Sequence, residues 1–281
     1  MKFSAILLSQ ALLAASALAA PKGHGLAARV AARNARSRLS HPNIPAPAPE
    51  TVGEEKIAPN RTNVDYSSNW SGAVLTSPPS GSTFTSVSAQ FTVPSPSLPQ
   101  GSQQSSSASA WVGIDGDTYT NAILQTGVDF NVDSNGQVSY DAWYEWYPDY
   151  AHDFTGISFK SGDVVSVSVT SSSNSQGTAV IENLTNGQKV TKTLSAPSSG
   201  ATLGGQNAEW IVEDFESGGG LVPFANFGTV KFTKASAGTS SGSSVGTDGA
   251  DILDIQQNGK VLTSASTPSS SEVDVTYTGG N

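Results

Sequence analysis

Three segments of the chain place carboxyl or amide side chains next to large aromatic ones. They are residues 110–127, 140–148 and 207–216. A carboxyl group beside aromatic rings is partly desolvated, which raises its pKa and suits it to general acid–base catalysis. If the chain is an enzyme, these segments are where its chemistry should be sought.

Other catalytic groups are scarce after residue 61. Residues 62–281 contain no cysteine and a single histidine, His152, so thiol catalysis and a multi-histidine metal site are excluded. No Gly-x-Ser-x-Gly elbow, phosphate loop or dinucleotide fingerprint is present. The triplet Asp115-Gly116-Asp117 begins like a calcium loop, but the glutamate spacing that follows is wrong. We therefore expect carboxylates to carry the chemistry, with no metal and no cofactor.

Strand periodicity decides which of these side chains can meet, because alternate residues of a strand share a face. Two such sets are Asp141, Trp143, Glu145 and Tyr147, and Glu209, Ile211, Glu213 and Phe215. The alternative is that Trp111, Trp143 and Trp146 form a sandwich core while the acids face solvent, as in an ordinary half-buried strand. The residues alone leave both interpretations open.

The pattern from about residue 63 onward is that of β-strands. Val165, Val167 and Val169 alternate with polar residues, and the pairs Asn186-Gly187 and Asn258-Gly259 predict hairpins. No stretch after residue 62 has a convincing helical period. We predict one all-β domain over 62–281, an antiparallel β-sandwich of two sheets of the concanavalin-like or jelly-roll type. A monomer is the expected state.

The first 19 residues predict a signal peptide. Lys2 precedes a short apolar run that ends in the small-residue triplet 17–19 (Ala-Leu-Ala), as at a signal-peptidase site. Polar residues interrupt the run, and no later segment is long and apolar enough to span a bilayer. We therefore expect a secreted, extracellular protein that does not bind a membrane.

Charge divides the remaining chain into two parts. Eight of the 14 lysines and arginines of the whole sequence lie at or before Arg61, whereas 62–281 has six lysines, no arginine and 20 acidic residues, a formal charge of −14. The basic part, 20–61, should be attracted to the acidic domain. We predict that 20–61 is a propeptide that inhibits the domain intramolecularly. Nucleic acid is not expected as a partner of an exported protein.

Two features are predicted within this propeptide. Arg29, Arg33 and Arg36 recur at a spacing that would align them on one side of a helix. Residues 41–49 (HPNIPAPAP) predict an extended, hinge-like linker.

Asparagine glycosylation motifs occur at Asn60, Asn69 and Asn183, and Asn183 is the preferred acceptor because it lies beside a predicted turn.

Several unusual motifs together resemble one known family. They are SNWSGA at 68–73, WVGIDGD at 111–117, ILQTG at 123–127, residues 140–148, ENLT at 182–185, NAE at 207–209 and VEDFE at 212–216. In order and spacing they resemble the glutamic peptidases, the fungal pepstatin-insensitive acid proteases of the scytalidoglutamic and aspergilloglutamic type. This resemblance implies a two-sheet sandwich that hydrolyses peptide bonds in proteins at acid pH.

The resemblance also implies roles for particular residues. The catalytic pair would be Gln125, in ILQTG, and Glu209, in NAE, which together activate a water molecule. The residues that match the lining of the family's cleft are Trp111, Asp115, Trp143 and Glu145. Some relatives have disulfides and this chain has no cysteine, which bears on stability and not on the pair.

Two other functions remain alternatives on the residues alone. A glycoside hydrolase could use Glu145 and Glu209 as paired carboxylates, with tryptophan and tyrosine as sugar platforms. It would leave the basic pro-segment without a purpose. A non-catalytic carbohydrate-binding sandwich would tolerate replacement of both Gln125 and Glu209.

Overall fold

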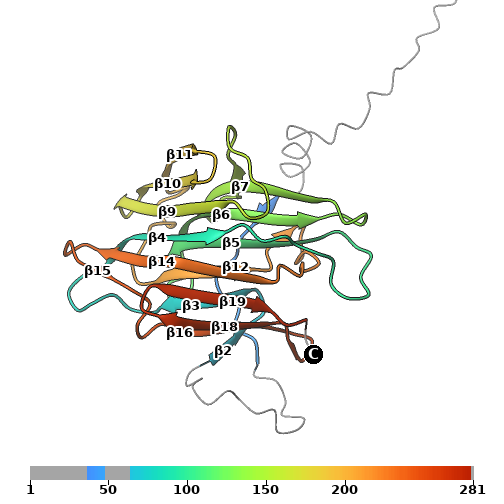
Figure 1. Ribbon diagram of the computed structural model, residues 1–281. Coiled ribbons are helices and arrows are strands. Elements are labelled where there is room, and N and C mark those ends of the chain that lie inside the picture. The colour runs from blue at the N-terminus through green and yellow to red at the C-terminus, as the bar shows by residue number, and fades with distance from the viewer. Residues whose placement is uncertain (1–36, 48–63, 280–281) are drawn as a thin grey trace, which may run out of the picture.

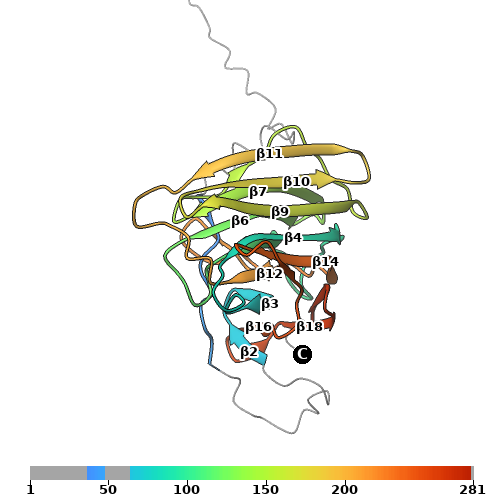
Figure 2. The same ribbon diagram turned by 90° about the vertical axis from the view of Figure 1, so that its left-hand side faces the viewer.

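The computed structural model describes residues 37–47 and 64–279, and all regular structure within these ranges is β. Two large sheets lie face to face as layers (Figures 1 and 2). The predicted all-β sandwich is therefore confirmed. None of the described residues forms a helix that could cross a membrane. The signal peptide and the arginines predicted to align on a helix lie outside the described residues.

The first sheet has eight strands, in the order β11-β10-β9-β4-β14-β19-β18, with β15 paired to β14. Their bounds are β4 (Phe84–Thr92), β9 (Val164–Ser173), β10 (Gln176–Asn183), β11 (Gln188–Ser195), β14 (Thr229–Thr239), β15 (Ser244–Val245), β18 (Thr263–Ser269) and β19 (Glu272–Tyr277). All of its described pairings are antiparallel.

The second sheet has nine strands, in the order β17-β16-β3-β12-β5-β6-β7-β8, with β2 paired to β16. Their bounds are β2 (Val64–Ser67), β3 (Trp70–Leu75), β5 (Ser106–Ile114), β6 (Ile123–Val132), β7 (Val138–Tyr147), β8 (His152–Asp153), β12 (Ala208–Glu213), β16 (Asp251–Gln257) and β17 (Lys260–Val261). The β2–β16 pair is parallel, which departs from the purely antiparallel prediction. A separate small sheet pairs β1 (Arg38–Leu39) with β13 (Glu216–Ser217).

Both predicted hairpins form. Strands β10 and β11 pair up to Asn183 opposite Gln188, so four residues rather than two make the turn around Asn186-Gly187. Asn258 and Gly259 join β16 to β17 with φ values of 52° and 77°, the positive values that a two-residue hairpin turn requires.

The main core lies between the two sheets. The alternate apolar residues of β9 predicted to point inward are fully buried there, as are Trp210 and Phe91. Phe91 packs edge-on against Phe130 across the sandwich and against Phe232 beside it. The Trp210 indole donates a hydrogen bond to the backbone oxygen of Ser88, which satisfies its one polar atom inside the core.

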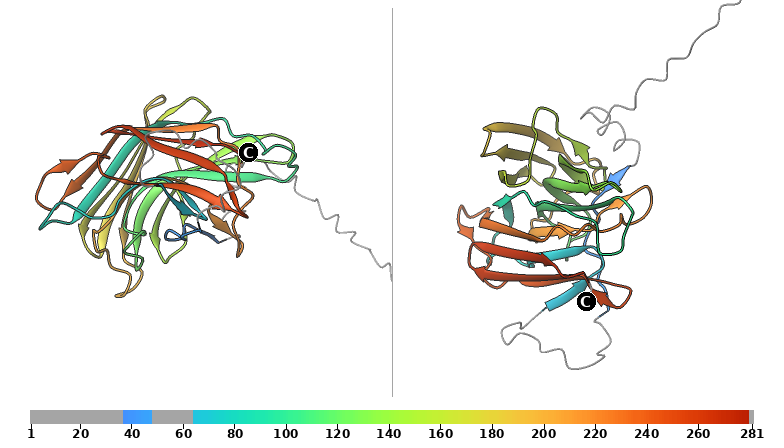
Figure 3. Two further views of the ribbon diagram at one scale, coloured as in Figure 1. Left: turned by 90° about the horizontal axis from the view of Figure 1, so that it is seen from below. Right: turned by 45° about the vertical axis from the view of Figure 1, so that its right-hand side comes forward.

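A second apolar cluster lies on the opposite face of the nine-stranded sheet. Its members are Trp70, Val74, Trp111, Ile123, Trp143, Ala151, Ile211 and Leu253. Residues 37–47, which we call the strap and which include β1, run across this face. Figures 2 and 3 show the strap as a blue trace along one side of the molecule.

The strap is tied to the sandwich along most of its length. Asn43 N–H donates to the Gly116 oxygen at 2.9 Å, and Ala46 N–H donates to the Tyr66 oxygen at 2.8 Å. At its start, β1 pairs with β13 and the Arg38 oxygen accepts from Ala151 N–H at 3.0 Å. The prediction of a hinge-like linker is therefore wrong for 41–47, which is extended but docked.

Asn183, predicted as the preferred glycosylation acceptor, is not accessible. Its side chain is fully buried, and its amide donates to the Ser158 oxygen at 2.9 Å and to Asp163 Oδ2 at 2.8 Å. The folded chain therefore hides this asparagine from glycosylation. Asn69 is likewise buried, and Asn60 lies outside the described residues.

Candidate active site

A single row of residues crosses the face of the sheet beneath the strap. Glu145 lies opposite Gln125, Gln125 opposite Gly113, and Gly113 opposite Glu209. Four neighbouring strands, β7, β6, β5 and β12, each contribute one of these residues. Because all four residues point to the same face, segments far apart in the sequence bring two carboxyls and an amide together around a glycine.

Gly113 keeps the space between Gln125 and Glu209 open. The two flanking strands lie about 10 Å apart, twice the usual strand spacing. A Cβ atom on Gly113 would stand 3.3 Å from Glu209 Oε1 and 3.4 Å from Gln125 Cβ. The backbone of Gly113 has no left-handed φ, so the glycine serves close approach rather than a turn.

Glu209 is a fully buried carboxyl group. Among the described residues, neither of its oxygens has a hydrogen-bond partner. Burial raises the pKa of Glu209 well above its usual value, and the nearby Asp115 and Asp117 carboxyls raise it further. Glu209 therefore holds its proton to a higher pH than an exposed glutamate does.

Gln125 is held by Glu145. Gln125 Nε2 donates to Glu145 Oε1 at 3.3 Å, and both side chains are fully buried. An amide nitrogen carries two protons, so one remains for a second acceptor. Gln125 Oε1 has no partner within the described part of the chain. Glu145 thus orients the amide from the side away from Glu209.

Asp115 acts on the loop that precedes Glu209 and touches neither Gln125 nor Glu209. Its carboxyl accepts hydrogen bonds from the backbone N–H groups of four consecutive residues, 204–207, at 2.7–3.3 Å. Burial raises the pKa of Asp115, and these four donors oppose the rise. Asn207, in the second loop, binds the first loop in turn, since its Oδ1 accepts hydrogen bonds from the backbone N–H groups of residues 117–119. The two loops therefore lock each other just before β12 begins.

The aromatic residues divide between the two faces of the sheet. Trp146 belongs to the core between the sheets, as the alternative interpretation had it. Trp111 and Trp143 lie on the row side, where Trp111 Nε1 donates to Glu213 at 2.9 Å and Trp143 Nε1 to Ser109 at 3.0 Å. These two tryptophans form the floor beside the row.

Arg38 of the strap contacts this face of the sheet at Asp129, a residue that the sequence analysis did not identify. It is 2% exposed and makes two hydrogen bonds of 3.1 Å to the Asp129 carboxyl. Its guanidinium also lies 3.4 Å from Glu145 Oε2 and 3.9 Å from the centre of the Trp143 ring. Asp129 could have been found from its spacing, because it lies four residues after Gln125 on one strand face.

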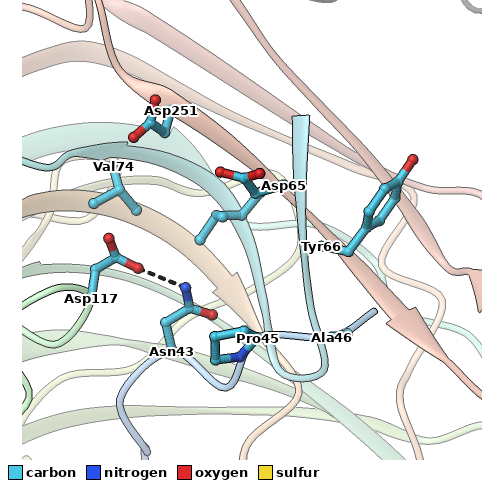
Figure 4. A pocket seen from close by; sticks show the side chains of 9 residues that line it. Asn43, Pro45, Ala46, Asp65, Tyr66, Val74, Asp117 and Asp251 are labelled. Carbon is cyan, nitrogen blue, oxygen red and sulfur yellow. Dashed lines mark hydrogen bonds between the residues drawn. The ribbon is translucent and has the colours of Figure 1, made fainter. Parts of the chain in front are cut away.

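The other end of the strap borders a small acidic pocket of about 230 Å³ (Figure 4). Asp65, Asp117 and Asp251 line it, and Asn43 Nδ2 donates to Asp117 Oδ1 at 2.6 Å. Burial raises the pKa of Asp117, with smaller contributions from the other two carboxyls. Within the described ranges, no group of histidine, cysteine or acidic residues is arranged to hold a metal ion.

An all-β sandwich with buried carboxyl and amide groups side by side on one covered face is compatible with a hydrolase that works by acid–base chemistry. Comparison with known proteins places the chain within that class. A family model described as the Peptidase A4 family matches residues 68–277. The chain belongs to this family and is a glutamic endopeptidase.

Two relatives and one solved structure show the extent of the similarity. Aspergillopepsin-2 of Aspergillus niger is 50% identical, covering 99% of this chain and 100% of its own. Scytalidopepsin B of Scytalidium lignicola is 44% identical, covering 95% and 96%. A crystal structure of scytalido-glutamic peptidase with a transition state analog inhibitor superposes with a TM-score of 0.64 at 44% identity, covering 75% of this chain and 98% of that one. Membership of a peptidase family decides against the glycoside hydrolase and carbohydrate-binding alternatives.

Proposed function

We propose that Glu209 and Gln125 form the catalytic pair of this acid peptidase. The observation that carries the proposal is their placement on either side of Gly113, with a buried, unpartnered carboxyl facing an amide. Such polar groups require a partner when they are desolvated, and a water molecule or a peptide carbonyl can supply it. Asp115, Trp111, Trp143 and Glu145 support this pair.

The steps follow from the chemistry of the two groups. As a carboxylate, Glu209 takes a proton from a water molecule held between it and Gln125, and the water oxygen attacks the peptide carbonyl carbon. The free N–H of Gln125 donates to the oxyanion that develops. Glu209 then returns the proton to the leaving amine. Glutamine suits this role because its amide stays neutral at any pH.

We further propose that the chain is an exported zymogen and that the strap is its intramolecular inhibitor. Arg38 and Ser40 of the strap contact Glu145 at one end of the row. At the other end, buried Glu209 has a raised pKa, which opposes its action as a base. Departure of the strap would readmit water and lower the pKa of Glu209. The ion pairs from Arg38 to Asp129 and Glu145 help to hold the strap in place. Acid would favour its departure, because lowering the negative charge of the domain weakens its attraction for the basic propeptide.

The test is digestion of a denatured protein at pH 2–4, with pepstatin present to suppress aspartic peptidases. Wild type and Glu209→Gln are compared after both have lost residues 1–61. We expect cleavage by wild type and a rate at least about a hundredfold lower in the variant, the usual contribution of a general base. Equal rates from two folded proteins would contradict the role of Glu209. For Gln125, a Gln125→Glu variant with unchanged activity and pH profile would contradict the donor role.

A further inference from the structure

Glu213 is a fully buried carboxyl group that the proposed mechanism does not use. It lies four residues after Glu209 on β12, so both side chains point to the same face of the sheet. Trp111 Nε1 donates to Glu213 Oε2 at 2.9 Å. The other groups that bear on it are Arg38 and Ser40 of the strap and Asp129 of β6.

The Trp111 ring connects Glu213 to the catalytic row. A Cβ atom on Gly113 would stand only 2.9 Å from Trp111 Cζ3, so one edge of the indole lies beside the gap between Gln125 and Glu209. Gly127 of β6 lies opposite Trp111 of β5 and also leaves room for the Trp111 side chain, because a Cβ on Gly127 would come within 2.5 Å of Trp111 Cβ. The indole therefore spans from the carboxyl of Glu213 to the open space above Gly113.

Two contacts fix the orientation of this indole. Trp70 packs against it edge-on, with ring centres 5.0 Å apart and an interplanar angle of 78°. The ring packing restrains the position of Trp111, and the hydrogen bond to Glu213 determines which way its N–H points. A buried indole N–H needs an acceptor, and Glu213 Oε2 is the one that it has.

We propose that Glu213 is a positioning residue for peptide hydrolysis, which holds the Trp111 indole against the gap between Gln125 and Glu209. This inference rests on the proposed catalytic pair. Held in place, the indole is an apolar wall that limits the water around Glu209 and supports the attacking water. If the anchor is lost, the ring can tilt and the geometry of the gap changes.

The protonation state of Glu213 does not alter this role. Burial raises the pKa of Glu213 to about 7, against the opposing effects of Arg38, Ser40 and Trp111. The carboxyl is therefore neutral at acid pH, and its carbonyl oxygen still accepts the indole N–H. A glutamine offers the same acceptor, whereas a leucine offers none.

The experiment compares kcat and its pH profile for processed wild type, Glu213→Gln, Glu213→Leu, Trp111→Phe and the Glu213→Leu/Trp111→Phe double variant. We expect Glu213→Leu to lower kcat by roughly ten- to a hundredfold, as losses of supporting contacts do, and to shift the pH profile. Glu213→Gln should retain most of the activity. In the Trp111→Phe background, which has no indole N–H, Glu213→Leu should cost little more.

Asp214→Asn is the matched control. Asp214 is the neighbouring buried acid, and its carboxyl accepts a hydrogen bond from Gln257 Nε2 rather than from Trp111. The Asp214→Asn variant should therefore have the wild-type kcat. The proposal is overturned if Glu213→Gln is as impaired as Glu213→Leu, or if the losses of Glu213→Leu and Trp111→Phe multiply in the double variant.

Two further measurements keep the test decisive. If thermal unfolding shows that Glu213→Leu does not fold, Trp111→Phe removes the same hydrogen bond from its donor side, and an unchanged kcat and pH profile there would overturn the proposal. Glu209→Gln is assayed in parallel. If it cleaves like wild type, the catalytic pair is wrong, and that outcome is separate from any result at position 213.

Discussion

The two faces of the nine-stranded sheet are built from the same strands and serve different ends. One face packs against the second sheet and contains Trp210 and Trp146 in a continuous apolar core. The other holds buried Gln125, Glu145 and Glu209 among tryptophans, and the strap runs across it. Successive side chains of each strand therefore point alternately into the permanent core and toward the face that the strap covers.

The largest expected effect is on the core face. Trp210→Ala removes a fully buried indole and leaves a cavity, so we expect a loss of about 3–5 kcal/mol in the free energy of unfolding. Ile211→Ala, on the opposite face of the same strand, should cost much less in the processed enzyme, where the strap no longer crosses that face. Urea unfolding at one pH measures both. Equal losses would mean that the face crossed by the strap, which we call the cleft face, is as much a structural core as the face that packs against the second sheet.

The next effect tests what closes the cleft face. Arg38→Ala breaks buried pairs with Asp129 and Glu145 and leaves their carboxyls uncompensated, which should weaken docking of the strap by about 3 kcal/mol, or roughly a hundredfold. We expect the unprocessed variant to cleave a peptide near pH 6, where the unprocessed wild type is silent. Arg38→Lys is the control that keeps the charge but not the paired geometry. Silence from Arg38→Ala would show that other strap contacts suffice for closure.

A pH dependence should follow from the carboxyls of the cleft face. The raised pKa of Glu213 means that the folded chain binds this proton more tightly than the unfolded chain. Its stabilising contribution is present below about pH 4.5 and is lost as the pH rises to about 7, by up to about 3 kcal/mol. The free energy of unfolding of unprocessed Glu213→Gln should therefore fall less over this window than that of wild type. Parallel curves would contradict the assignment.

Replacement of Gly113 should have the smallest effect on stability of these changes and a large effect on activity. Gly113→Ala places a methyl group 2.9 Å from Trp111 and 3.3 Å from Glu209, which should cost about 1–2 kcal/mol of stability and reduce kcat at least about tenfold. Gly200→Ala is the matched control, because a Cβ there meets only a side-chain oxygen at 4.0 Å. A fully active Gly113→Ala would show that the gap tolerates a methyl group.

Local patterns in the sequence predicted much of this sandwich. The valines of β9, the two hairpins and the shared face of Glu209 and Glu213 all follow from a period of two and from turn residues, which depend on near neighbours only. The division of Trp143 from Trp146 follows from the same period, since the two differ by three positions. Asp129 lay within reach of that argument and was missed.

The site itself required the order of the strands. Gln125 and Glu209 are 84 residues apart, and nothing local in either segment says that Gly113 lies between them. The strap is a similar case: its proline-rich sequence is typical of an extended linker, while its docking depends on Tyr66 of β2 and on Asn69 and Gly116 in loops. Sequence alone determined which residues each strand shows on each face, because side-chain direction alternates locally. Only the tertiary structure decided which of those faces meet, because strand order and the burial that shifts each pKa are set by contacts between distant segments.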